Sequence, residues 1–166
     1  MKRLNFVVVI VSLFTAMFCS SCDKEDSDFH NNVYVVGYED NNNGVPIAKL
    51  WKNEVVQNFA DGSRSSAINS LYILSNNVYT AGIELTENNG WMAALWKNSE
   101  KQYLAGGIWS NASEVYILDD NVYVAGSVIR NIADVNGVAR LWNNGKFQDL
   151  TDGTYDAVAY SVFVVK

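Results

Sequence analysis

One motif occurs three times along this 166-residue chain at a nearly constant spacing. Each copy begins with Asn-Val-Tyr, at residues 32, 77 and 121, and these starts lie 45 and 44 residues apart. A Leu-Trp pair follows in every copy, at residues 50, 95 and 141. A repeat period of this length is typical of proteins built from stacked copies of one supersecondary unit. The chain is therefore predicted to fold as an array of three similar units.

Each unit is predicted to contain four short strands. In the middle copy, apolar runs occupy residues 71–74, 78–81, 92–96 and 102–105, and turn-forming residues separate most of them. Asn144-Gly145, before the last run of the third copy, is a strong signal for a tight hairpin. No run after residue 22 has the period of a helix. The predicted fold is all-β, with four-stranded antiparallel meanders of about 45 residues each.

The strands carry apolar residues on both faces, so each sheet is expected to be stacked between two others. Val33 and Val35 point one way and Tyr34 and Val36 the other. The recurring tryptophans are predicted to lie in the core between the sheets; they are Trp51, Trp96 and Trp142. A glycine is predicted to end the second strand of every unit, at a bulge or a close backbone approach. These glycines are Gly37, Gly82 and Gly126.

Four-stranded units of this period, stacked through two apolar faces, favour a β-propeller. From Asn32 to Lys166 the chain resembles the propeller repeats of secreted bacterial proteins with Ala-x-Leu-Trp-Lys-Asn in the third strand. It does not resemble WD40 or Kelch repeats, because Gly-His and Trp-Asp pairs are absent and Gly106-Gly107 is the only glycine pair. The resemblance implies an architecture and no particular activity.

Three blades are fewer than the roughly four to eight of closed propellers. The domain, residues 32–166, begins at a second strand (Val33) and ends at a first strand (161–165), and in a closed ring these two strands would pair. Three explanations stay open: a fragment of a longer reading frame, a homodimer that completes a six-bladed ring, or an open body of three sheets. The predicted fold class is three blades of a partial or oligomer-completed β-propeller.

The start of the chain is predicted to be a signal peptide over residues 1–21. Met1-Lys2-Arg3 is basic, and the apolar run from Phe6 to Phe18 is too short to span a bilayer comfortably. Cys22, preceded by Ser21, resembles the lipid-modified cysteine of a bacterial lipobox. The chain departs from that motif at Cys19, where leucine is usual. The resemblance implies an acyl anchor on Cys22, and the alternative is an ordinary secretory signal.

Residues 22–31 are predicted to form a lipidated N-terminus and an acidic tether. Lys24-Glu25-Asp26, just after Cys22, resembles the export signal of some surface lipoproteins of Gram-negative bacteria. That resemblance implies an outer-membrane lipoprotein exposed on the cell surface, with the membrane as a partner through the lipid. The alternative is a solvated spacer without a targeting role.

Charge and residue content exclude several classes of function. Loss of Lys2 and Arg3 with the signal peptide changes the formal net charge from −6 to −8, so nucleic-acid binding is not expected. His30, the only histidine, lies in the tether, and no cysteine follows Cys22. A Ser-His-Asp triad and a thiolate or histidine metal site in the domain are thereby excluded. We expect no cofactor and no metal, and the favoured reading is not an enzyme.

The predicted function is that of a surface-anchored binding module. In a propeller the loops after the second and fourth strands emerge on the same face, and here these loops are 38–45, 84–91, 127–137, 62–66, 106–111 and 153–156. Aromatic and arginine side chains on rigidly held loops are typical of binding faces, and for any single residue the alternative explanation is loop packing and solubility. The candidates for binding a glycan, peptide or partner protein are Tyr38, Arg64, Trp91, Trp109, Arg130 and Tyr155.

Two alternatives to a binding module remain. A polysaccharide-acting propeller enzyme would use pairs of loop carboxylates for acid–base chemistry. Its candidate carboxylates are Glu39, Asp40, Asp134, Asp152 and Asp156. The second alternative is an inactive piece of a longer propeller protein.

Overall fold

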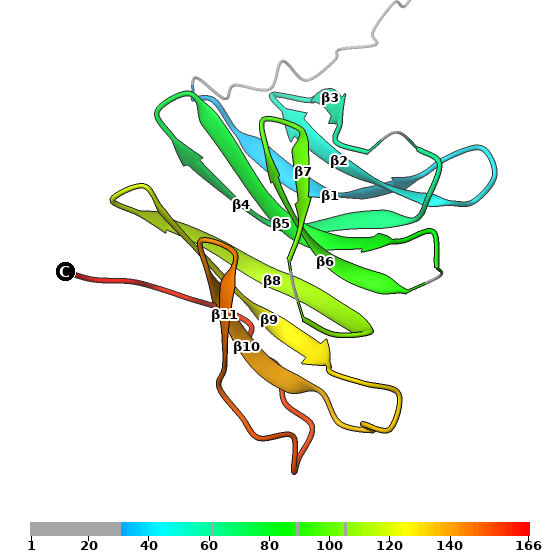
Figure 1. Ribbon diagram of the computed structural model, residues 1–166. Coiled ribbons are helices and arrows are strands. Elements are labelled where there is room, and N and C mark those ends of the chain that lie inside the picture. Colours follow the sequence, from blue (N-terminus) through cyan, green and yellow to red (C-terminus); the bar gives the residue numbers. More distant parts are fainter. Residues whose placement is uncertain (1–30, 61, 89, 105) are drawn as a thin grey trace, which may run out of the picture.

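The chain folds into β-strands that form three separate sheets. The structure, a computed structural model, describes residues 31–60, 62–88, 90–104 and 106–166. These residues contain eleven strands, every strand pairing is antiparallel, and there is no helix among them (Figure 1). The predictions about the signal peptide, the lipidated Cys22 and nearly all of the tether concern residues 1–30, which lie outside the described part of the chain.

In every sheet, strands that are consecutive in the sequence are also neighbours in space. The first sheet contains β1 (Tyr34–Asp40), β2 (Pro46–Lys52) and β3 (Val55–Asn58). The second contains β4 (Ser66–Leu74), β5 (Asn77–Leu85), β6 (Trp91–Lys97) and β7 (Glu100–Tyr103). The third contains β8 (Trp109–Leu118), β9 (Asn121–Ile129), β10 (Val138–Asn143) and β11 (Lys146–Asp149). The predicted all-β fold of antiparallel meanders is confirmed.

The recurring asparagines form the turn between the third and fourth strands of a unit and hydrogen-bond this turn to the start of the second strand. Asn98 and Ser99 have φ angles of 49° and 74°, the left-handed conformation of a type I′ turn, which asparagine tolerates well. The Asn98 side chain accepts a hydrogen bond from the Val78 N–H (2.9 Å) and donates one to Asn77 Oδ1 (2.8 Å). Asn53 and Asn144 make the same pair of contacts in the first and third sheets. The sequence motif is therefore a hydrogen-bonded clamp as well as a turn.

The three sheets stack through their apolar faces. One buried cluster lies between the first and second sheets and includes Leu50, Phe59 and Trp96. A second lies between the second and third sheets and includes Leu104 and Trp142. In both clusters the tryptophan belongs to the later sheet and faces the earlier one. The predicted core position is confirmed for these two tryptophans, whereas Trp51 in the first sheet is partly exposed.

The glycines of the repeat do not end the second strand, as the sequence predicted. β5 continues to Leu85 and β9 to Ile129, three residues past Gly82 and Gly126. The predicted close approach is confirmed in these two sheets, because the first strand of the unit, β4 or β8, bulges opposite the glycine. We call this first strand the innermost strand, after its expected place in a propeller. A Cβ atom would lie 2.0 Å from a backbone carbonyl oxygen at either position. Glycine is thus required by the neighbouring strand.

The C-terminal residues 161–165 do not form the predicted strand, and they do not pair with β1. Among the described residues the only strand hydrogen-bonded to β1 is β2, and no closed sheet forms. The physical reason is that the C-terminal segment packs at the far end of the stack, with the second sheet between it and β1 (Figure 1). There Phe163 lies edge-on to Tyr116, with ring centroids 5.0 Å apart.

Candidate functional site

The loops that follow the second and fourth strands of each unit are joined to one another by hydrogen bonds. The Leu85 N–H donates to the Ser65 carbonyl (2.8 Å), which connects the β5–β6 loop to the segment before β4. The Ile108 N–H donates to the Ile129 carbonyl (2.9 Å), and Asn136 Nδ2 donates to the Thr154 carbonyl (2.9 Å). The two sets of loops therefore meet at one end of the sheets, opposite the β4–β5 and β8–β9 turns (Figure 1).

The structure places only some of the six predicted binding residues on loops. Tyr38 lies within β1 opposite Ala48, because β1 runs on to Asp40, so the predicted loop position of Tyr38 is wrong. Trp91 and Trp109 are the first residues of β6 and β8. The loop prediction holds for the other three, of which Tyr155 is strongly exposed; they are Arg64, Arg130 and Tyr155.

Both candidate arginines are already paired with groups on neighbouring loops. Arg64 Nη2 lies 2.9 Å from Glu87 Oε1 on the β5–β6 loop. Arg130 Nε lies 3.4 Å from Asp134 Oδ2, and its Nη2 donates to the Asp152 carbonyl at 2.9 Å. These exposed ion pairs are expected to be weak and to depend on salt. These ion pairs connect neighbouring loops at this end of the sheets. The side chains of Arg64, Glu87 and Arg130 stay partly or largely exposed to solvent.

The ends of β8 and β9, the β9–β10 loop and the segment with Asp156 and Val158 line an open pocket of about 330 Å³. Trp109 forms part of its wall, and Ser127 and Asp156 contribute polar groups. Asp156 Oδ1 accepts a hydrogen bond of 2.7 Å from the Gly137 N–H, which fixes the carboxylate at the rim. We call this the Trp109 pocket; its remaining lining residues are Ile129, Val135, Gly137 and Val158.

Two residues of the Trp109 pocket depart from the repeat. The position of Trp109 corresponds to Ser65, since each directly precedes a buried serine, Ser110 or Ser66, in an innermost strand. Asp156 occupies this same repeat position in the C-terminal segment, since Ser65, Trp109 and Asp156 each lie seven residues before Tyr72, Tyr116 or Phe163. A repeat position whose residue differs between copies is not explained by the shared fold, and this signal was available in the sequence. The sequence prediction included Trp109 but did not connect it with Asp156.

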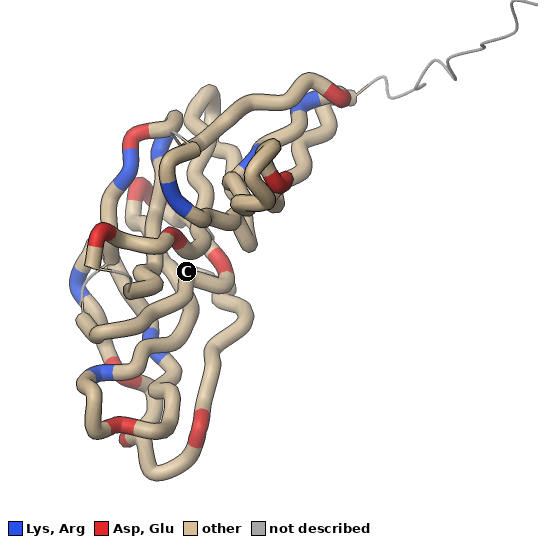
Figure 2. Tube along the Cα trace, turned by 90° about the vertical axis from the view of Figure 1, so that its right-hand side faces the viewer, with Lys and Arg blue, Asp and Glu red and all other residues tan. Residues whose placement is uncertain are grey.

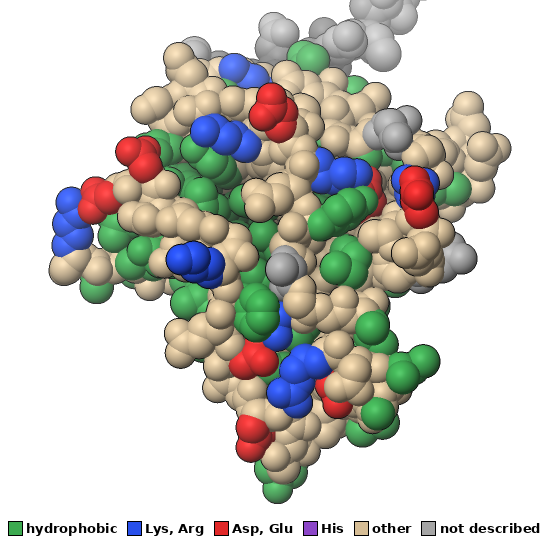
Figure 3. Space-filling model, in the orientation of Figure 1, with side chains coloured by type: hydrophobic (Ala, Val, Ile, Leu, Met, Phe, Trp, Pro, Cys, Tyr) green, Lys and Arg blue, Asp and Glu red, His purple; other side chains and the backbone are tan. Residues whose placement is uncertain are grey.

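The surface around the Trp109 pocket is apolar as well as charged. Figure 3 shows hydrophobic side chains at its lower right, over the β9–β10 loop, where Ile132 and Val135 are almost fully exposed.

The backbone N–H and hydroxyl of Thr154 stabilise the Asp152 carboxylate and keep the pKa of Asp152 below its ordinary value. Charges of both signs are spread along the trace without a patch of one sign (Figure 2).

A second cavity, of about 460 Å³, lies at the loop end between the first and second sheets. Arg64 and Glu87 line it, together with Val45 and Leu85. It has no aromatic wall, and its two charged side chains are paired with each other at 2.9 Å. We therefore regard the Trp109 pocket as the better candidate for a ligand.

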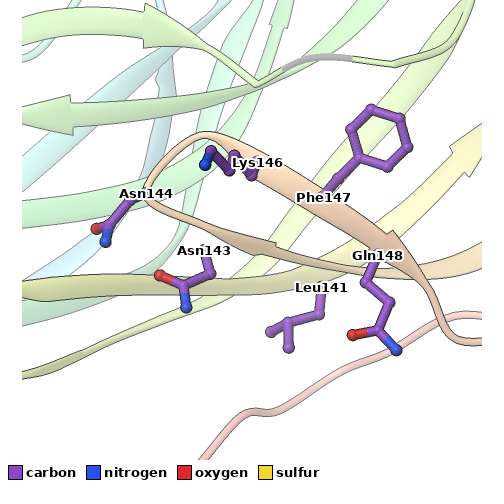
Figure 4. A pocket seen from close by; sticks show the side chains of 6 residues that line it. All are labelled: Leu141, Asn143, Asn144, Lys146, Phe147 and Gln148. Atoms are coloured by element: carbon purple, nitrogen blue, oxygen red, sulfur yellow. The ribbon is translucent and has the colours of Figure 1, made fainter.

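A third hollow of about 390 Å³ lies on the face of the β10–β11 hairpin. Figure 4 shows Leu141, Asn143 and Gln148 pointing to the same side of this hairpin, while Phe147 points away from them. Phe147 instead stacks on the buried Arg140 guanidinium, 3.8 Å from the ring centroid to Cζ. The hollow contains no carboxylate and none of the predicted binding residues.

Two buried charged groups escaped the sequence prediction, and both stabilise the fold. Arg140 Nε pairs with Asp149 Oδ1 at 2.6 Å, and Nη1 donates to the Gly106 carbonyl at 2.6 Å. Glu84 of β5 is buried, and its carboxylate accepts hydrogen bonds from Lys101 and from the Tyr103 hydroxyl of β7. Each group is satisfied by neighbouring strands, as buried charges must be.

Four of the five carboxylates considered for acid–base chemistry have local partners, Asp156 through the Gly137 N–H. Glu39 lies 3.4 Å from Lys49, Asp134 3.4 Å from Arg130, and Asp152 accepts from the Thr154 N–H. Among the described residues there is no group of three or more histidine, cysteine, aspartate or glutamate side chains placed to hold a metal ion. In the same part of the chain no helix has the length and apolarity to cross a membrane.

The described residues at the loop end bring one aromatic wall, Trp109, and the polar groups of Ser127 and Asp156 to one space. A scan against protein-family models gives no match for the chain, and a search of curated proteins finds no similar sequence.

Proposed function

We propose that this chain is a lipid-anchored binding protein of the bacterial cell surface, built from propeller-type blades, that holds a carbohydrate in the Trp109 pocket. The observation that carries the proposal is the cavity of about 330 Å³ in which Trp109 and the fixed Asp156 carboxylate face one space. Its walls come from loops and strand ends supported by a packed sheet, which is the usual placement of binding residues.

The Trp109 pocket has the mixture of groups that a sugar requires. The C–H face of a sugar ring packs on an indole, and its hydroxyls hydrogen-bond to carboxylate and hydroxyl oxygens. Trp109 supplies the ring, and Asp156 and Ser127 supply acceptors next to it. The exposed apolar residues Ile132 and Val135 extend the surface for further ring contacts.

The propeller arrangement is supported by how the sheets are built and stacked. The second and third sheets each contain four antiparallel strands in chain order, and β4 and β8 pack on the sheet that precedes them. Repeated sheets that meet face to face are the structural unit of a propeller. The cell-surface anchor rests on the sequence of residues 1–31, where Cys22 follows an apolar segment and an acidic stretch comes next.

A glycan array probed with the full chain in detergent tests the binding function. We expect binding to one class of glycan, lost at least tenfold in Trp109→Ser, since serine is the residue at the equivalent position 65. Trp91→Leu is the matched control, because Trp91 also begins a strand but does not line the Trp109 pocket. Absence of glycan binding, or binding that Trp109→Ser leaves unchanged, would refute the proposal.

The anchor is tested separately in cells. Metabolic labelling with a radioactive fatty acid should mark the wild-type chain and leave Cys22→Ser unlabelled. Protease added to intact cells should then degrade the wild-type chain. Labelling that persists in Cys22→Ser, or a chain fully protected from protease, would contradict the surface lipoprotein.

A further inference from the structure

The first and second sheets, and the second and third sheets, pack face to face at two contacts that we call junctions. These junctions show which residues a sheet buries when another sheet covers it. At each junction the later sheet presents a tryptophan and the β-strand residues beside it. Trp96 and Thr80 of the second sheet and Trp142 and Val124 of the third are all 0–1% exposed. The earlier sheet presents a large apolar residue just after its outermost strand: Phe59, 7% exposed, or Leu104, 1% exposed.

The first sheet presents the same tryptophan face, uncovered by any described residue. Val35 occupies the position of Thr80 and Val124 but is 52% exposed. A hollow of about 470 Å³ lies over this face, lined by Val33, Val35 and Trp51. An apolar face of this kind on a stacked sheet is expected to be covered.

The third sheet presents the complementary face, also uncovered over its outer part. Leu150 corresponds to Phe59 and Leu104, since each donates its N–H to an alanine carbonyl of the third strand, yet Leu150 is 51% exposed. The hollow beside Leu141 and Gln148 lies on this side (Figure 4). Leu141 corresponds to Leu50, which packs in the same cluster as Trp96. The open face of the third sheet therefore carries the same kind of residues as the faces of the first and second sheets that pack against Trp96 and Trp142.

Gly37 indicates that a strand belongs at the free edge of β1. Its counterparts Gly82 and Gly126 are required, because a Cβ there would lie 2.0 Å from the carbonyl oxygen of the bulged innermost strand. At Gly37 the nearest atom to a Cβ belongs to Trp51 at 3.5 Å, an ordinary contact. Nothing within the described chain demands glycine at this position, whereas a bulged strand beside β1 would.

The C-terminal segment already occupies the place of such an innermost strand. The Val162 N–H donates to the Glu114 carboxylate, as the Val115 N–H donates to Ser70 Oγ one sheet earlier. Phe163 lies 5.0 Å from Tyr116, as Tyr116 lies 5.2 Å from Tyr72. The segment is thus stacked on the third sheet without pairing to any described strand, while β1–β3 form a three-stranded sheet in which no described strand lies at the other edge of β1.

We propose that a second copy of this chain supplies the missing partner, with β1 of one copy pairing with residues 157–165 of the other. The repeat predicts the register: Tyr34 opposite Phe163 and Val33 opposite Val164, as Tyr79 is opposite Tyr72 and Val78 opposite Ile73. The open face of the first sheet then covers Leu141 and Leu150 of the third sheet of the other copy. The inference is independent of the ligand proposed for the Trp109 pocket.

A second copy fits better than the chain's own C-terminal segment. In one chain, the second sheet separates β1 from residues 157–165, which would have to leave Glu114 and Tyr116 to reach β1. In a dimer the segment keeps these contacts and uses its other edge. Two copies with three sheets each form two equal junctions and a ring of about six blades, within the range of closed propellers.

Sedimentation equilibrium of the full chain in density-matched detergent tests the dimer. We expect the mass of two chains for wild type and of one chain for Val35→Lys, because the lysine would be buried in both junctions. Val55→Lys is the control: Val55 is exposed on β3, and the equivalent positions carry the charged Glu100 and Lys146. A wild-type mass of one chain at all concentrations, or dimers unaffected by Val35→Lys, would overturn the proposal.

Two single-cysteine chains test the register and exclude closure within one chain. In a background without Cys19 and Cys22, Val33→Cys and Val164→Cys are made in separate chains. Facing residues of antiparallel strands lie within the Cα separation of a disulfide. We expect a disulfide-linked pair when the chains are mixed and oxidised, and none for Val33→Cys mixed with Val162→Cys. If the Val33→Cys, Val164→Cys double variant instead forms only a disulfide within a monomer, the partner is the chain itself and the dimer is refuted.

Discussion

Asn144 Oδ1 accepts a hydrogen bond of 2.9 Å from the backbone N–H of Val122, which connects the turn between the third and fourth strands of the unit to its second strand. Asn144 also donates to Asn121 Oδ1 (2.8 Å) and holds a left-handed φ of 49°. One side chain therefore serves both turn geometry and strand attachment. The same relationship at Asn53 and Asn98 explains why the motif recurs with so little variation.

Asn144→Ala is expected to lower the free energy of unfolding by about 1–3 kcal/mol, because it removes two exposed hydrogen bonds and strains the left-handed turn. Asn144→Gly loses the same hydrogen bonds but tolerates the turn, so it should cost about 1 kcal/mol less. Urea unfolding of the three proteins measures the difference. Equal losses in both variants would show that the turn conformation contributes nothing.

Gly126→Ala and Gly37→Ala form a pair that tests the bulge. A Cβ at residue 126 would lie 2.0 Å from the Asn111 carbonyl oxygen, so we expect a loss of at least about 3 kcal/mol or failure to fold. At residue 37 the same change meets only Trp51 at 3.5 Å and should cost less than about 1 kcal/mol at low protein concentration. Thermal unfolding in dilute solution makes the comparison, and comparable losses would contradict the bulge as the reason for glycine.

Asp149→Ala removes the charged partner of Arg140, a side chain 2% exposed. Loss of one member of a buried ion pair typically costs about 3–5 kcal/mol, and the exposure of Asp149 places the expected loss near the lower figure. Arg140→Met, which removes the buried charge itself and keeps an apolar stem between Trp142 and Phe147, should cost less than Asp149→Ala. Denaturant unfolding of both variants checks the order, and the reverse order would show that the guanidinium does not depend on Asp149.

Stability is expected to fall at alkaline pH through the Glu84 cluster. Burial and the hydrogen bond to Glu84 raise the pKa of Tyr103. Burial alone would lower the pKa of Lys101, but its hydrogen bonds to Glu84 and Tyr103 raise it overall. The folded protein therefore binds these protons more tightly than the unfolded chain. The resulting stabilisation is complete below about pH 10 and is lost as pH rises through the raised pKa values.

Urea midpoints at about pH 8 and about pH 11 measure this loss. Glu84→Gln removes the negative charge that holds both protons, so its midpoint should fall less between the two pH values than that of wild type. A drop as large in Glu84→Gln as in wild type would assign the alkaline loss to other groups.

The sequence was sufficient for the strand content and for the stacking of sheets through apolar faces, but its prediction that every sheet lies between two others holds only for the second sheet among the described residues. Apolar runs of four or five residues and the turn residues between them depend on local chemistry, so they predicted every hairpin of the second sheet. The burial of Trp96 and Trp142 followed from repetition, because only a shared environment explains one large residue at one place in each unit.

Features that depend on contacts between distant residues were not predictable. The length of β5 beyond Gly82 is set by pairing with both β4 and β6, which a local pattern does not reveal. The position of the C-terminal segment depends on Glu114 and Tyr116, 48 and 47 residues earlier than their partners Val162 and Phe163. The Trp109 pocket combines residues from β8, β9 and the segment after β11, and only its departure from the repeat marked it in advance.

Because the packing runs from each sheet to the next, the middle sheet is the only one whose two faces are both covered by described residues of the same chain. The energetics of such a stack are close to those of a linear chain of nearest neighbours. In the monomeric chain, such as Val35→Lys, amide protons of β5 and β6 should then exchange with solvent most slowly, and those of β1–β3 should exchange first, since in the monomer that sheet can detach by opening a single junction. The first sheet, which detaches most readily, is also the sheet whose free edge at β1 and whose Trp51 face are exposed for contact with another molecule.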